Sequence, residues 1–337
     1  MIDFRSDTVT LPTPGMLAYM QAAPLGDDVF GEDPSINALE AKTAGLFGME
    51  AGLFCPSGTM TNQLAIKTHT QAGDEVICEE LSHIYQYEGG GIASNSGSSV
   101  KLLRGNRGRI TAAQVLAAIN PEDVHKPISK LVSLENTCNR GGGACYDFSE
   151  IEAIHKVTKS NDLGLHLDGA RIFNAIVQKK EDPKQYGKVF DSISICLSKG
   201  LGAPVGSVLL GSTPFIKKAR RWRKVFGGGM RQAGSLAAAG IYALDNHIDR
   251  LKEDHTKALE IKTALSKKDF VKEIFEVETN IVIAHIEGKY NATQLAAALK
   301  EKSILVIAMT PVLIRFVVHL DITNEMLART LETIEKL

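Results

Sequence analysis

The chain has 337 residues, and its 38 lysines and arginines nearly balance 39 aspartates and glutamates, for a formal net charge of −1. A chain of this length predicts about two domains. With 44% hydrophobic and 23% charged residues, the composition is that of a globular protein, which excludes disorder as the main state. Because the charge is near zero, we expect no general attraction to nucleic acid or to an anionic membrane surface.

Neither the cysteines nor the first residues indicate export. The five cysteines are scattered and form no CxxC pair or ligand set with nearby histidines, so we expect reduced thiols and no metal site: Cys55, Cys78, Cys138, Cys145 and Cys196. The opening MIDFRSDTVT places charges where a secretory signal needs an apolar run. No stretch approaches the roughly 18 apolar residues of a membrane span. We therefore expect a cytoplasmic protein with no membrane partner.

Short apolar segments followed by turns recur along the first two thirds of the chain and predict strands. They are residues 52–55, 74–80, 99–103, 130–137, 163–170, 192–200 and 207–212. Helical patterns such as residues 147–160 separate them, and the strands are nearly all apolar, as buried parallel strands are. The sequence therefore predicts an α/β fold whose polar strand ends gather at one edge of the sheet, where ligands bind.

The last third of the chain changes in character. After glycines 227–229, residues 231–265 carry a helical pattern that predicts a bridge to a second domain. The remainder reads as a strand, a helix, a strand pair and a helix capped by Thr323, over residues 279–286, 292–302, 304–309, 312–320 and 324–337. We expect an N-terminal segment (1–14), a large domain (15–250) and a small C-terminal α+β domain (251–337).

The segment PSGTMTN follows a predicted strand and opens a predicted helix. Ser57, Gly58 and Thr59 would present backbone N–H groups and hydroxyls at the helix N-terminus, which favours an anion such as phosphate. The alternative is that a hydroxyl merely caps the helix. Neither GxGxxG nor GxxxxGK[ST] is present, which weakens dinucleotide and nucleoside-triphosphate interpretations.

Two charged residues follow predicted buried strands. Lys199 closes one strand and precedes GLGAPVGS, whose glycines let backbone approach a ligand. A lysine there can form an imine with a carbonyl cofactor, although most lysines are simply solvated. Asp168 comes directly after another strand, where a carboxylate needs a cation. A protonated pyridine nitrogen would be such a cation.

Two further residues have open interpretations. His83, in SHIYQYEGG, could stack on a flat cofactor ring or exchange protons, or it could be structural. Arg315 interrupts an apolar strand and needs an anion, either a substrate carboxylate or a structural acid.

The six cations of KKARRWRK, residues 217–224, could suggest nucleic acid, but their helical spacing favours a solvated face with one or two members neutralising phosphate.

Nine ordered segments together resemble the low-specificity L-threonine aldolase family, a group of fold-type-I pyridoxal-phosphate enzymes. They are FRSDTVTLPT, GDDVFGEDPSINALE, PSGTMTNQLA, HIYQYEGGG, LENTCNRGGG, HLDGARIFNA, SKGLGAPVGSVL, GGGMRQAG and IRFVVHLD. The resemblance runs from the first residues to Asp321. It implies a large domain with a mostly parallel seven-stranded sheet, a small C-terminal α+β domain, and pyridoxal 5'-phosphate as cofactor.

The resemblance also implies roles for single residues. Lys199 would form the Schiff base, and Asp168 would pair with the pyridinium nitrogen. The substrate carboxylate would be held by Arg171, Ser6 and Arg315. Arg171 would also contact the cofactor. The cofactor contacts that remain would come from Ser57, Gly58, Thr59, His83, which stacks over the ring, and Arg231, which can reach in from a neighbouring subunit.

The base that takes the proton of the β-hydroxyl is assigned to His83 or to His125, which resembles a second family histidine. Two positions depart from the family pattern: Phe30 stands where GDDVYGEDP is usual, and Cys138 replaces the histidine of ENTHN. Neither change removes an element of the Schiff-base chemistry, so the departures bear on substrate preference.

The expected activity is cleavage of L-threonine, L-allo-threonine and related β-hydroxy-α-amino acids to glycine and an aldehyde, a lyase reaction of threonine breakdown and glycine supply. The alternatives are a β-eliminating lyase, an aminotransferase, a relative acting on serine, and a non-catalytic scaffold that binds a ligand or partner. The resemblance further implies a homotetramer, built as a dimer of dimers with shared active sites.

Overall fold

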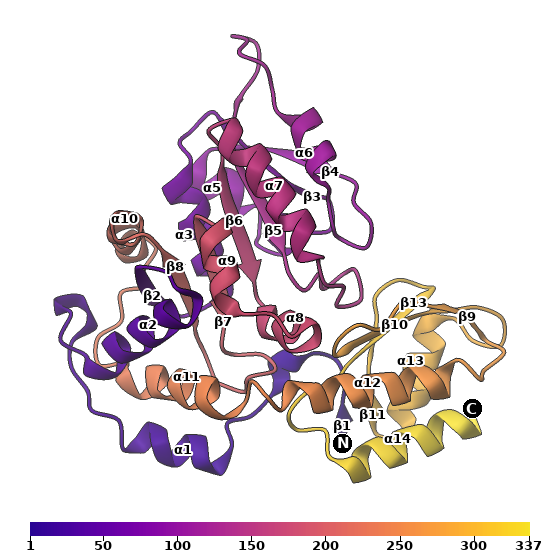
Figure 1. Cartoon of the computed structure of the whole chain (residues 1–337). Coiled ribbons are helices and arrows are strands. Elements are labelled where there is room, and N and C mark those ends of the chain that lie inside the picture. The colour runs from indigo at the N-terminus through magenta and orange to yellow at the C-terminus, as the bar shows by residue number, and fades with distance from the viewer.

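The computed structural model describes residues 1–337 and is organised around a seven-stranded sheet (Figure 1). The strand order is β2-β8-β7-β6-β5-β3-β4, and only β8 runs against the others. The strands are β2 (Ala51–Cys55), β3 (Asp74–Glu79), β4 (Ser99–Leu103), β5 (Ile128–Glu135), β6 (Gly164–Gly169), β7 (Ser192–Cys196) and β8 (Ser207–Gly211). The expected mostly parallel seven-stranded sheet is confirmed.

Helices cover both faces of this sheet because alternate strand residues point to opposite sides. One face packs against α3 (Gly58–His69), α4 (His83–Gln86), α5 (Gly91–Ser96) and α10 (Thr213–Val225). The other face carries the main core of 41 buried residues and packs against α2 (Pro34–Phe47), α6 (Ala112–Ala118), α7 (Phe148–Ser160), α8 (Ile172–Lys179) and α9 (Pro183–Val189). Behind α2 lie α11 (Gly234–Asn246) and α1 (Pro14–Gln21).

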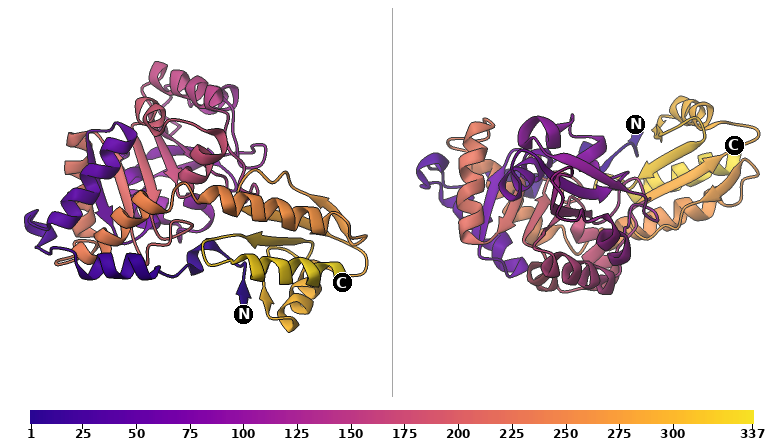
Figure 2. Two further views of the ribbon diagram at one scale, coloured as in Figure 1. Left: turned by 60° about the horizontal axis from the view of Figure 1, so that its bottom comes forward. Right: turned by 90° about the horizontal axis from the view of Figure 1, so that it is seen from above.

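A second, smaller body contains a four-stranded antiparallel sheet in the order β12-β13-β10-β9, beside the large sheet (Figures 1 and 2). Its core of 21 buried residues is separate from the main core. Its elements are β9 (Val271–Ile274), β10 (Ile281–Ile286), β11 (Ile304–Leu305), β12 (Ile307–Ala308), β13 (Leu313–Val317), α12 (Leu251–Leu265), α13 (Ala292–Glu301) and α14 (Asn324–Lys336). The expected small α+β domain is confirmed, including the Thr323 cap of α14.

The N-terminus joins this small body before the chain enters the large one (Figure 2). Strand β1 (Ile2–Asp3) pairs in parallel with β11, and Ile2 and Phe4 are buried in the small core. Two short 3-10 helices follow, η1 (Asp7–Val9) and η2 (Asp28–Phe30). Residues on η1 and in the linkers therefore lie between the two bodies, which matters for the site.

Several local expectations were wrong in detail. Strand β4 lies at an edge of the sheet and is largely exposed, so it is not one of the expected buried parallel strands. Residues 304–309 form two short strands in different sheets, because β11 pairs with β1 and β12 pairs with β13. The helical pattern of residues 231–265 is divided into α11 and α12, with a break at residues 247–250.

All five cysteines are buried and free, as expected for packed thiols. No helix is both long and apolar enough to cross a bilayer.

Candidate active site

The candidate site lies at the carboxyl edge of the central strands, where Asp168 precedes the last residue of β6 and Glu135 ends β5. These two carboxylates face each other across the β5–β6 pair, and both are buried. Asp168 accepts hydrogen bonds from Asn62 Nδ2 at 2.9 Å and from the backbone N–H of Ala170 at 3.1 Å. No lysine or arginine forms an ion pair with it, so a buried anion at this edge is available to an incoming cation.

A third buried carboxylate, Glu88, holds His83 beside Asp168. Because a carboxylate only accepts, the 3.0 Å contact assigns a proton to His83 Nδ1 and leaves Nε2 for other partners. Glu88 also accepts from Asn62 Nδ2 at 2.9 Å and from Gln63 Nε2 at 2.6 Å. Burial lowers the pKa of His83, but the hydrogen bond to Glu88 and the charge of Asp168 outweigh it, so the pKa is raised.

The same three residues, His83, Glu88 and Asp168, place one ligand atom each within 4.8 Å of one another. Such a set could hold a divalent cation. However, the Asn62 amide already bridges the two carboxylates, and a metal here would compete with any other cation for Asp168.

Lys199 follows β7 and meets the N-terminus of α3. Its Nζ lies 3.6 Å from Cys196 Sγ, and a Cβ added at Gly58 would overlap that same sulfur. Ser57 caps α3 by accepting from the backbone N–H of Met60 at 3.2 Å, as the cap interpretation expects. The exposed Thr59 and the first N–H groups of the helix remain available to an anion next to Lys199.

A buried hydroxyl that sequence reasoning did not select lies at this helix end. Ser207 Oγ has no hydrogen-bond partner, and it is 3.5 Å from the place a Gly58 Cβ would occupy. An unpartnered buried hydroxyl beside a helix N-terminus is suited to donate to phosphate. The donors needed for a phosphate group and the buried carboxylate needed for a ring nitrogen are therefore both present, and pyridoxal phosphate fits this donor set.

Arg315 comes to the site from β13 of the small body. Its Nη1 donates to Asn139 Oδ1 at 2.9 Å and its Nη2 to the backbone oxygen of Arg5 at 3.1 Å, while its buried Nε has no partner. Burial, and then the charge of Arg171, lower the pKa of Arg315 to about 10, so it stays a cation at neutral pH. This cation is not neutralised by any carboxylate of the chain. The neighbouring Ser6 caps η1 and accepts from Thr8 Oγ1 at 2.8 Å.

Arg171, expected at the substrate carboxylate, is engaged by the protein itself. It makes two parallel hydrogen bonds to Asp7, from Nε at 2.7 Å and from Nη2 at 2.6 Å, and both side chains are buried. Burial raises the pKa of Asp7, but the Arg171 charge and hydrogen bonds outweigh it and hold that pKa below its usual range. The pair ties η1 to α8, so Arg171 positions the N-terminal segment beside Arg315.

The chain does not bring every predicted residue to this edge. His125 lies in the loop before β5, at the amino edge of the sheet, where its side chain is 86% exposed and its Nδ1 contacts Asp123. Arg231 is half exposed and pairs with Asp27 at 3.0 Å, with its guanidinium over the exposed ring of Phe30. Cys138 is buried, with its thiol donating to the Glu135 carbonyl at 3.0 Å.

The basic run forms most of α10, and part of it is neutralised. Arg223 is buried and pairs with Asp28 at 2.6 Å, and Arg220 pairs with Glu40 at 2.6 Å. Lys67 lies over the Trp222 ring. Some cations of α10 therefore form ion pairs within the chain and the others face solvent, in line with the interpretation of a solvated face.

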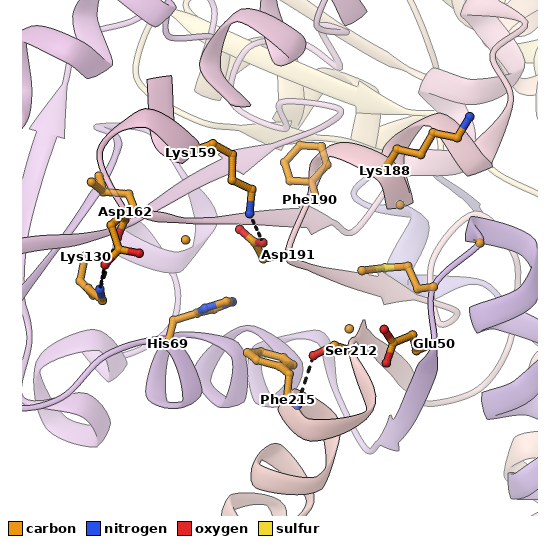
Figure 3. Close-up of a pocket in the computed structure, with 16 residues that line it drawn as sticks. Glu50, His69, Lys130, Lys159, Asp162, Lys188, Phe190, Asp191, Ser212 and Phe215 are labelled. Carbon is orange, nitrogen blue, oxygen red and sulfur yellow. Dashed lines mark hydrogen bonds and ion pairs between the residues drawn. The ribbon is translucent and has the colours of Figure 1, made fainter. Parts of the chain in front are cut away.

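A pocket of about 570 Å³ at the opposite, amino edge of the sheet contains none of the predicted residues (Figure 3). Its lysines face helix C-termini or acids: Lys159 pairs with Asp191 at 2.6 Å and Lys130 with Asp162 at 3.0 Å. Cations there offset the negative ends of helix dipoles. The pocket's charges are therefore explained by stability and point to no reaction.

Comparison with known proteins agrees with this geometry. The model of a family described as beta-eliminating lyase matches residues 3–289. The low specificity L-threonine aldolase of Escherichia coli (strain K12) is 43% identical over 329 residues, 97% of this chain and 96% of that protein. Low-specificity L-threonine aldolase 1 of Arabidopsis thaliana is 39% identical, over 99% of this chain and 96% of its own length.

Among solved structures, the threonine aldolase of Leishmania major superposes with a TM-score of 0.85 at 21% identity, covering 100% of this chain and 99% of that one, which establishes the common fold. The chain belongs to the beta-eliminating lyase family and, within it, to the low-specificity L-threonine aldolases.

Besides Ser207, five site residues were missed by sequence reasoning: Asn62, Glu88, Glu135, Asp7 and Asn139. Each lies inside or next to a quoted motif, but an acid or amide in a motif carries no sign of its partner. Glu88 lies beyond the end of α4, five residues after His83, so helical spacing does not predict its contact with the imidazole.

Proposed function

We propose that this chain is a pyridoxal-phosphate-dependent aldolase that cleaves L-threonine, L-allo-threonine and related β-hydroxy-α-amino acids to glycine and an aldehyde. The observation that carries the proposal is the combination of a half-buried cation that no carboxylate neutralises, Arg315, with a buried anion, Asp168, and a lysine, Lys199. Full-length similarity to threonine aldolases gives the reaction class.

The cofactor would be held by residues of the large body. Lys199 would bind it through Nζ, the N-terminus of α3 with Ser57, Gly58 and Thr59 would receive its phosphate, and Asp168 would face its ring nitrogen. When bound, pyridoxal phosphate supplies an aldehyde that condenses with amines and a ring that accepts the electron pair released at Cα.

The chain's own groups would orient the amino acid and move its protons. Arg315, with Ser6 beside it, would bind the carboxylate and so fix which bond at Cα is broken. His83, held by Glu88 through Nδ1, would present Nε2 to the β-hydroxyl and accept its proton directly or through a water. Lys199 Nζ would return a proton at Cα to release glycine.

We also propose the homotetramer with shared sites and a cytoplasmic location. The exposed side chains of His125, Arg231 and Phe30 support a shared site, because they are free to contact a neighbouring chain. Five free, buried cysteines support a reducing compartment. The domain division at residues 14 and 250 remains our proposal.

The experiment is a steady-state assay on L-threonine, L-allo-threonine and their D-enantiomers, with glycine and aldehyde both quantified. An aldolase yields the two in equal amounts. Because the family model carries the name beta-eliminating lyase, ammonia and a keto acid are measured in parallel, and their appearance without glycine would favour elimination. A colourless protein that does not react with borohydride would favour a non-catalytic scaffold.

A further inference from the structure

The proposed mechanism does not use the carboxylate of Glu135, which accepts one backbone hydrogen bond on each of its two oxygens. Oε2 accepts from the N–H of His83 at 2.7 Å, and Oε1 accepts from the N–H of Asn139 at 2.9 Å. Glu135 is the last residue of β5, one of the central strands, and its backbone position is fixed by pairing with Asp168 of β6. A rigid strand end therefore anchors two loops at once.

Each of the two anchored loops carries a group of the site. The first begins α4 and bears the imidazole that Glu88 orients. The second presents Asn139 Oδ1, which accepts from Arg315 Nη1 at 2.9 Å. Contacts from one carboxylate thus run to the imidazole in one direction and, through the Asn139 amide, to the guanidinium in the other.

We propose that Glu135 is a positioning residue that sets the spacing between the His83 imidazole and the Arg315 guanidinium, and thereby the orientation of the bound amino acid. This inference rests on the proposed function of the site. The two groups contact opposite ends of the reacting unit, the β-hydroxyl and the carboxylate. A change in their spacing therefore misplaces the bond to be broken, even when each group still binds.

Only the ionised form of Glu135 offers both oxygens as full acceptors, because protonation turns one of them into an O–H donor. Burial, and then the charge of Asp168, raise the pKa of Glu135 to about 7, while its two backbone hydrogen bonds lower it. The positioning is therefore complete above that pKa and weakens as the pH falls through it. The titratable and charged groups whose fields reach this carboxylate are Asp168, His83, Arg171, Cys78 and Cys138.

The test compares Glu135→Gln with a matched control, Glu79→Gln, in the cofactor-loaded enzyme. Glu79 ends the neighbouring strand β3, is also buried, and also accepts from two backbone N–H groups, those of Leu81 and Gly105, neither of which belongs to a site residue. In each variant an amide NH₂ replaces one of the two acceptor oxygens. A purely structural role would make their kinetics alike.

For Glu135→Gln we expect kcat/KM on L-threonine to fall about tenfold, the effect of losing one hydrogen bond to a charged group. In the wild type, we expect protonation of both Glu135 and His83 to lower kcat/KM below neutral pH. In Glu135→Gln, we expect only the protonation of His83 to remain in the pH profile. Glu79→Gln should match wild type in both respects. Bound cofactor, measured by its visible absorbance, should be unchanged.

Asn139→Ala gives an independent arm of the test, because this partly exposed loop side chain can be shortened without opening the core. We expect it to raise KM for the amino acid and keep the wild-type pH profile. In the double variant with Glu135→Gln, the effects on KM should be less than additive, since both act on Arg315.

Equal kinetics for the two glutamine variants, or full additivity in the double variant, would overturn the role of Glu135. A wild-type enzyme that produces no glycine and aldehyde would instead overturn the proposed function. The two failures are therefore distinguishable.

Discussion

Arg171 is buried and Arg315 is half-buried at the site, and the structure gives the two arginines different roles, which alanine substitution separates. Arg171 is neutralised by Asp7, whereas Arg315 donates only to an amide oxygen and a backbone oxygen. A guanidinium has five N–H donors. The unpartnered Nε of Arg315 is among those that remain for a substrate carboxylate.

The magnitudes follow from these contacts. A hydrogen bond to a charged group contributes about 1.5–3 kcal/mol, so losing a two-bond contact to the substrate costs at least about 3 kcal/mol. For Arg315→Ala we therefore expect KM for L-threonine to rise by about 100-fold or more. Arg171→Ala leaves Asp7 buried without its cation, and breaking such a pair lowers the free energy of unfolding by about 3–5 kcal/mol.

The assays are substrate-saturation kinetics and urea unfolding on both variants, with bound cofactor measured first. Because the folded pKa of Asp7 lies below its ordinary value of 3.8, its contribution to stability is present above that value and is lost as the pH falls through the folded pKa. Arg171→Ala should remove this acid dependence. An unchanged KM in Arg315→Ala, or a rise in KM without loss of stability in Arg171→Ala, would refute the division of roles.

Three further outcomes are expected. Lys199→Ala should abolish both the borohydride-reducible linkage to the cofactor and the formation of glycine, and retained turnover would contradict its assignment. Asp168→Asn should still bind cofactor but turn over about 100-fold more slowly, as expected when a buried ion pair is lost, and an unaltered kcat would argue against its pairing with the ring. Glu88→Gln should lower the pKa of His83 in an NMR titration, because the hydrogen bond to the carboxylate helps raise that pKa. Because the folded pKa of His83 is raised, its pair with Glu88 stabilises the fold below pH 6.5, and this stabilisation is lost as the pH rises through the folded pKa. No change in the titration would remove Glu88 from its role.

Much of the fold could be read from local sequence. The central strands are nearly continuous apolar runs, so β3, β5, β6 and β7 fall close to their expected positions. Where the expectation was wrong, pairing between distant segments decided the outcome. Residues 304–309 divide between two sheets because Ile304 and Leu305 pair with Ile2 and Asp3. No local sequence pattern indicates a strand partner about 300 residues away.

The sequence by itself determined the kind of chemistry, because Lys199 and Asp168 follow buried strands whose ends must share one edge. Tertiary structure alone decided which charges are available. Arg171 and Arg315 look alike as residue types, but a carboxylate from the N-terminal segment neutralises one and leaves the other facing the site. The physical reason is that an electrostatic role depends on the nearest opposite charge, which for Arg171 lies 164 positions away in sequence.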